Sequence, residues 1–72
     1  MPDEYKTPFG YWDVDDVAVV IRRTADRGAT IDEVREDGTL RPFALGTVYR
    51  RGQHISRLEF VRRFPFAALI AL

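Results

Sequence analysis

The chain has 72 residues, no cysteine and eleven acidic side chains against eleven basic ones. This length predicts one domain with a small core, and the missing cysteines exclude a disulfide framework and a thiolate metal site. A hydrophobic fraction of 46% argues for a folded chain. No apolar run approaches the ~20 residues of a membrane-spanning helix. The polar first twenty residues are unlike a signal peptide, so we expect a cytoplasmic protein that does not enter a membrane.

The charges are unevenly distributed along the sequence. Residues 1–40 hold ten acids and five bases, whereas residues 41–72 hold six arginines and one acid, Glu59. Two interpretations are open. The basic half binds an anionic partner such as nucleic acid, or the two halves attract each other within the fold, and the two interpretations do not exclude each other.

The N-terminal forty residues predict an arm followed by two helices. Residues 1–12 contain two prolines and a glycine and are rich in aromatic side chains, so we expect an aromatic arm. Asp13 is a good N-cap, and apolar residues follow it at helical spacing up to Gly28. Thr30 and Glu33 form a capping box that predicts a second, short helix. The separation of these helices is typical of a helix-turn-helix.

The pattern after residue 38 predicts a β-ribbon. Residues 43–50 alternate loosely and contain good strand formers, the dipeptide Arg51–Gly52 is suited to a turn, and residues 53–55 supply a short return strand. A third helix follows, because Ser56 and Glu59 form another capping box. The uncharged tail, residues 65–72, is apolar and needs a cover.

These predicted elements, in this order, resemble the winged helix-turn-helix domains of the MerR and excisionase families. The resemblance extends over about residues 12–64 and rests on five stretches of sequence. They are Asp13–Ala18 for the opening helix, Thr30–Ile31 for the start of the recognition helix, Glu36–Pro42 for the stretch that ends it, Gly46–Tyr49 for the wing and Ile55–Arg63 for the helix after the wing.

The resemblance implies a small α+β winged helix-turn-helix that binds double-stranded DNA. Such a protein would be a transcriptional regulator or an excisionase-like recombination directionality factor. The chain would be one domain with an aromatic arm (1–12), a winged-helix core (13–64) and an apolar tail (65–72). The second helix would enter the major groove, and the wing and third helix would contact phosphates. The implied DNA-binding residues are Thr30, Arg35, Arg41, Arg50, Arg51, Arg57, Arg62 and Arg63.

The predicted recognition helix departs from the family because it is acidic. It carries four acids, Asp32, Glu33, Glu36 and Asp37, and a single base, Arg35. Carboxylates repel phosphates, so the wing arginines are expected to supply most of the DNA affinity. The alternative function is a non-catalytic protein-interaction module, such as a phage-type inhibitor or an antitoxin-like protein. This acidic segment would then bind a basic partner, and the tail would contact that partner or a second copy of the chain.

An alternative fold is also open for residues 29–50. Asp37–Gly38 is a favourable hairpin dipeptide, and a hairpin there would produce a helix packed on a small antiparallel sheet of three or four strands. Neither fold carries a recognisable catalytic constellation, because no nucleophile has a plausible base and no glycine-rich phosphate loop is present. His54 is the only histidine and is a poor metal ligand by itself. We therefore expect no enzyme, no cofactor and no metal.

Overall fold

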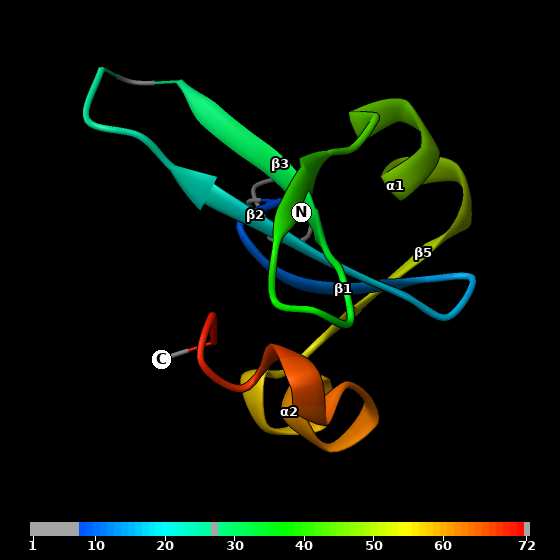
Figure 1. Cartoon of the computed structure of the whole chain (residues 1–72). Coiled ribbons are helices and arrows are strands. Elements are labelled where there is room, and N and C mark those ends of the chain that lie inside the picture. Colours follow the sequence, from blue (N-terminus) through cyan, green and yellow to red (C-terminus); the bar gives the residue numbers. More distant parts are fainter. Residues whose placement is uncertain (1–7, 27, 72) are drawn as a thin grey trace.

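The computed structural model describes residues 8–26 and 28–71 and contains one five-stranded antiparallel sheet with two short α-helices. Figure 1 shows α1 above the sheet and α2 below it. The elements in chain order are β1 (Gly10–Val14), β2 (Val17–Arg23), β3 (Ala29–Val34), β4 (Leu40–Pro42), α1 (Leu45–Arg51), β5 (Gly52–Ile55), α2 (Arg57–Arg63) and the 3₁₀ helix η2 (Pro65–Ala67). The predicted winged helix-turn-helix is therefore wrong.

Strands β1 to β4 form a simple meander, and the last strand, β5, pairs with the free edge of β1. Their order in the sheet is β4-β3-β2-β1-β5, and every neighbouring pair is antiparallel. The first four strands join through successive turns, and α1 then carries the chain from one edge of the sheet to the other. Strand β1 consequently lies between β2 and the edge strand β5, with Trp12 paired to Val19 on one side and to His54 on the other.

The predicted first helix is a β-hairpin. Val14 pairs with Val17, and the two residues between them, Asp15 and Asp16, have φ values of 52° and 70°. Two consecutive positive φ values are the geometry of a type I′ hairpin turn. The following apolar run is buried without interruption from Ala18 to Ile21, because both faces of β2 are covered. Such a run matches helical periodicity as well, but its branched side chains favour a buried strand.

The predicted second helix is the hairpin of β3 and β4. Its turn is closed by hydrogen bonds from the Arg35 amide to the Thr39 carbonyl (2.8 Å) and from the Gly38 amide to the Arg35 carbonyl (2.8 Å). The Asp37 carboxylate accepts from the amide and the hydroxyl of Thr39, and Gly38 has a φ of 87°. The hairpin about Asp37–Gly38 that the sequence left open is thus present, although the sheet has five strands and not three or four.

The predicted wing is also corrected. Seven residues of it, Leu45–Arg51, are helical, and the strand that follows pairs with β1 and not with a preceding wing strand. The predicted third helix is confirmed: the Ser56 hydroxyl accepts from the Glu59 amide at 3.1 Å and caps α2. Of the predicted capping box, the Ser56 bond is present because it depends on only four residues, whereas the Glu59 carboxylate accepts from Arg62 and Arg63.

Each face of the sheet carries its own small core. On the α2 side, Ala18, Val20 and Val34 pack with Phe60 of α2 and with Phe64. The tail completes this layer, since Ala67 and Ala71 are buried there. The other side packs three strand residues, Val14, Val19 and Ile21, against Val48 of α1. The apolar tail, which needed a cover, therefore packs on the body of the domain through these two alanines.

The C-terminal part of the predicted arm is the start of β1. Residues 1–7 lie outside the described part of the chain, and from Gly10 onward the residues belong to β1. Phe9 and Trp12 pack against the α1-side core, and the Trp12 indole donates to the Pro8 carbonyl at 2.8 Å. Tyr11 lies on the opposite face, with its ring 4.9 Å from that of Phe60.

A matched pair of glycine substitutions tests the junction of α1 and β5. A Cβ on Gly52 would meet the Val48 carbonyl oxygen at 2.5 Å and Trp12 at 3.0 Å, whereas a Cβ on Gly46 would meet only the Arg50 guanidinium, at 3.5 Å. We expect Gly52→Ala to lower the free energy of unfolding by ~1–3 kcal/mol. Gly46→Ala is expected to raise it by up to ~1 kcal/mol, because alanine favours a helix. Urea unfolding measures both, and a fully stable Gly52→Ala variant would contradict this junction.

Candidate functional site

The residues predicted to bind DNA are spread over several elements. Thr30 lies on β3 opposite Arg22, Arg35 lies in the β3–β4 turn, and Arg41 lies on β4 opposite Glu33. The other predicted residues are Arg50 and Arg51, at the end of α1, and Arg57, Arg62 and Arg63, on α2. Because α1 and α2 cover opposite faces of the sheet, the structure does not gather these arginines on one surface.

Several of these arginines are engaged by acids of the same chain. Arg63 donates to Asp13 at 2.7 Å and to Glu59 at 2.5 Å. Arg51 pairs with Asp15 at 2.7 Å, and Arg62 also binds Glu59. Two of these pairs, Arg63–Asp13 and Arg51–Asp15, join the basic half to the acidic half. The uneven charge distribution is therefore partly neutralised inside the fold.

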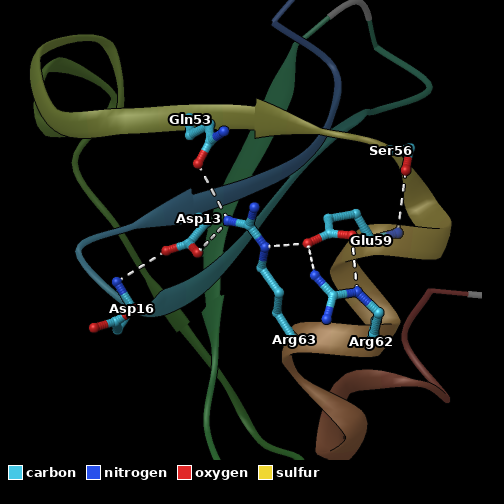
Figure 2. A network of polar contacts seen from close by, with 7 residues as sticks. All are labelled: Asp13, Asp16, Gln53, Ser56, Glu59, Arg62 and Arg63. Carbon is cyan, nitrogen blue, oxygen red and sulfur yellow. Dashed lines mark hydrogen bonds and ion pairs between the residues drawn. The ribbon is translucent and has the colours of Figure 1, made fainter.

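The Asp13 carboxylate holds two separate parts of the structure together. One oxygen accepts from the Asp16 amide at 2.9 Å and closes the β1–β2 turn, while the other accepts from Arg63 of α2. Arg63 also donates to Gln53 of β5 at 3.2 Å, as Figure 2 shows. The Asp13 side chain is only 12% exposed. Removing one partner of such a shielded ion pair is strongly destabilising, because the other charge stays buried without a partner.

Glu59 extends this network along α2. Hydrogen bonds from Arg62, and then from Arg63, lower the pKa of Glu59 to about 2. The Glu59 amide is the one that Ser56 caps, so the residue anchors both the start of α2 and its two terminal arginines. This part of the surface consequently presents paired charges and not a free basic patch.

A groove of about 610 Å³ lies where the β1–β2 turn, the β3–β4 turn and η2 meet. Ala18 and Val34, both buried in the α2-side core, contribute to its lining, and Phe66 of η2 lies beside them with 37% of its surface exposed. The remaining lining residues are Asp16, Val17, Glu33, Arg35, Glu36 and Asp37. We call this site the acidic groove.

The lining charges of the acidic groove sum to about three negative units. Four carboxylates, from Asp16, Glu33, Glu36 and Asp37, oppose one guanidinium, from Arg35. The Arg35 guanidinium lies 3.7 Å from the Glu33 carboxylate, and it forms no ion pair with the other three acids of the groove. Hydrogen bonds from Thr39 lower the pKa of Asp37, so this carboxylate stays charged in mildly acidic solution. The groove can therefore attract a cation while its apolar lining contacts a hydrocarbon stem.

Sequence reasoning identified part of this site for another reason. Glu33, Glu36 and Asp37 stood out because they contradict a DNA-reading helix, and the alternative function assigned them to a basic protein partner. Asp16 and Phe66 were missed as members of the same site. Their signals were an Asp–Asp dipeptide between two valine-containing runs, which suits a hairpin turn, and an aromatic residue directly after Pro65.

His54 and the acidic side chains are the possible metal ligands among the described residues. No group of three or more histidine, aspartate or glutamate side chains in residues 8–26 and 28–71 is arranged to hold a metal ion. His54 lies on β5, stacked on Trp12 with ring centroids 4.3 Å apart, and its Nε2 contacts the Phe9 carbonyl at 3.2 Å. Of the helices described, none is long and apolar enough to cross a membrane.

Comparisons with known proteins add no family to this description. No protein-family model, curated protein or solved structure matches the chain. The resemblance to MerR and excisionase domains thus rests on the sequence pattern alone, and the fold that it implied is corrected by the sheet. The feature of the described structure that points to a function is the acidic groove with its charges.

The Glu59 network predicts a specific response to acid. A carboxylate with a lowered pKa stabilises the fold above its unfolded pKa, here 4.5, and loses this contribution as the pH falls toward about 2. We expect Glu59→Gln to lower the melting temperature at pH 6. Between pH 5 and pH 2, the variant is expected to lose less of its melting temperature than the wild type. Circular dichroism at each pH measures this, and parallel acid profiles would contradict the Glu59 assignment.

Proposed function

We propose that this chain is a non-catalytic protein-interaction module that binds a basic segment of a partner in the acidic groove. The observation that carries the proposal is the combination of about three net negative charges with an apolar lining in one groove. A groove of this volume is within the range of sites that hold a ligand or a short peptide. No chemistry beyond binding is needed to explain its residues.

The lining specifies the chemistry of the partner segment. An arginine or lysine presents a cation at the end of a hydrocarbon stem, so its charge can meet Glu36 or Asp37 while its stem covers Phe66 and Val34. A neighbouring apolar side chain could use the remaining lining, since interfaces concentrate their energy in a few aromatic, apolar and arginine anchors. We therefore expect a segment with alternating basic and apolar residues, bound more tightly at low salt.

Duplex DNA stays a prediction from the arginine distribution and is the competing partner class. The acidic groove opposes it, because phosphates are repelled by carboxylates. The placement of the arginines also argues against DNA binding, because Arg51, Arg62 and Arg63 pair with acids of the same chain and lie on two faces of the sheet. The peptide and the duplex are consequently tested side by side.

Binding of a defined peptide tests the proposal. The probe is a short peptide of alternating leucine and arginine, added to ¹⁵N-labelled protein at low salt, with a leucine–glutamate peptide as its counterpart. We expect the arginine peptide to shift the amide resonances of Ala18, Val34 and Phe66. Glu36→Lys is expected to weaken the binding by about tenfold, since it reverses a charge next to the bound cation.

Asp26→Lys provides the matched control. It makes the same change of charge, but Asp26 is exposed and lies in the turn between β2 and β3, at the other end of these strands from the groove. Its affinity for the arginine peptide should stay close to that of the wild type. Equal weakening by both variants, or shifts centred on α1, would refute a groove-specific site. Binding of a short DNA duplex without binding of the peptide would support the competing partner class.

A further inference from the structure

The outer surface of α1 combines apolar and cationic groups. Leu45 and Tyr49, four residues apart on the same side of the helix, are 36% and 59% exposed. Arg50 is exposed beside them, and its guanidinium lies back over Gly46. We call Leu45, Tyr49 and Arg50 the α1 surface. It offers an aromatic ring, an aliphatic side chain and a guanidinium, which are the groups that the acidic groove is proposed to bind.

The acidic groove and the α1 surface carry opposite charges that the ion pairs within the chain do not neutralise. Among the described residues, Arg51 is paired with Asp15 and Arg63 with Asp13 and Glu59, whereas no ion pair joins Arg50 or Glu36 to another described residue. The chain as a whole has a formal net charge of zero at pH 7. Copies of the protein therefore do not repel one another through net charge, and opposite local charges can bring them together.

The α1 surface of one molecule cannot fill its own groove. It belongs to the helix that packs on Val14, Val19 and Ile21. The apolar lining of the groove includes Ala18 and Val34, which belong to the core on the other face of the sheet, together with Phe66 of η2. The sheet therefore separates the cationic surface from the acidic one. A second copy has no such restriction.

We propose that a second copy of this chain is a partner of the acidic groove, with Tyr49 and Arg50 of one molecule docked into the groove of the next. This inference rests on the proposed function and names its partner. The contact joins two different surfaces, so each molecule keeps one free groove and one free α1 surface. Such a heterologous contact extends into chains of molecules unless its rotation closes a ring.

The predicted association is weak, salt-sensitive and progressive. Sedimentation velocity of the full chain is run from about 20 μM to about 1 mM protein, a range that detects dissociation constants near a millimolar. We expect the weight-average mass to rise with concentration beyond that of a dimer at low ionic strength. In about 1 M salt, where the screening length is only ~3 Å, the protein should remain a monomer.

Mixing two variants tests the geometry of the contact. Glu36→Lys damages the groove and keeps the α1 surface, while Arg50→Glu damages the α1 surface and keeps the groove. Each variant alone is expected to stay monomeric, and their equimolar mixture is expected to form one-to-one dimers that grow no further. Asp26→Lys should associate as the wild type does. Circular dichroism verifies that every variant is folded, and Arg50→Ala replaces Arg50→Glu if that change disturbs α1.

Three outcomes would overturn the inference. If the wild-type chain stays monomeric at about 1 mM and low salt yet binds the leucine–arginine peptide, a second copy is not the partner, but the proposed function still holds. Failure to associate and failure to bind the peptide would remove both. Association that persists in Glu36→Lys and in Arg50→Glu would assign the contact to another surface, such as the exposed Leu58 and Leu69.

Discussion

The structure depends on the Asp13 carboxylate, which lies on the interior strand β1 and joins elements that are fifty residues apart. It accepts from the Asp16 amide and from the Arg63 guanidinium. The first bond shapes the β1–β2 turn and the second fixes the end of α2, directly before Phe64 and η2. These two places, the turn and η2, both contribute lining residues to the acidic groove. One shielded ion pair therefore sets the geometry of a site to which neither partner contributes a lining residue.

This arrangement also explains how a chain of balanced charge acquires charged surfaces. The acidic and basic halves do attract each other, through Asp13–Arg63 and Asp15–Arg51. These pairs join β1 and the β1–β2 turn to α2 and α1 respectively. Glu36 and Asp37 of the β3–β4 turn and Arg50 at the end of α1 form no ion pair with another described residue. The same topology thus pairs some charges of the two halves with each other and leaves other charges on the surface.

The sequence predicted the local features of this fold better than its global ones. Ser56 and Glu59 formed a recognisable cap because their bonds are local. The run from Val17 to Ile21 was misread, because a strand buried on both faces has no alternation and matches helical spacing equally well. Asp13 was read as a helix cap, a role that uses the same side-chain bond to an amide three residues on as the observed hairpin turn does.

The remaining errors came from contacts that are distant in sequence. The strand formers Thr47, Val48 and Tyr49 predicted a ribbon, but Val48 is fully buried against the sheet as part of a helix. Tertiary packing of one such residue outweighs the small propensity differences of its neighbours. The sequence revealed only part of the acidic groove. Asp16 and Phe66 lie beside Glu36 and Asp37 because of the folded sheet, and no local sequence pattern links them.

The most direct test of this account is the affinity of the leucine–arginine peptide for the Arg63→Gln variant, measured where the variant is folded. Removing Arg63 makes the protein more negative, so simple electrostatic attraction predicts tighter binding of a cationic peptide. The account predicts binding weaker by about tenfold, because the β1–β2 turn and η2 lose their common tie and the groove loses its shape. Affinity equal to or higher than that of the wild type would contradict it.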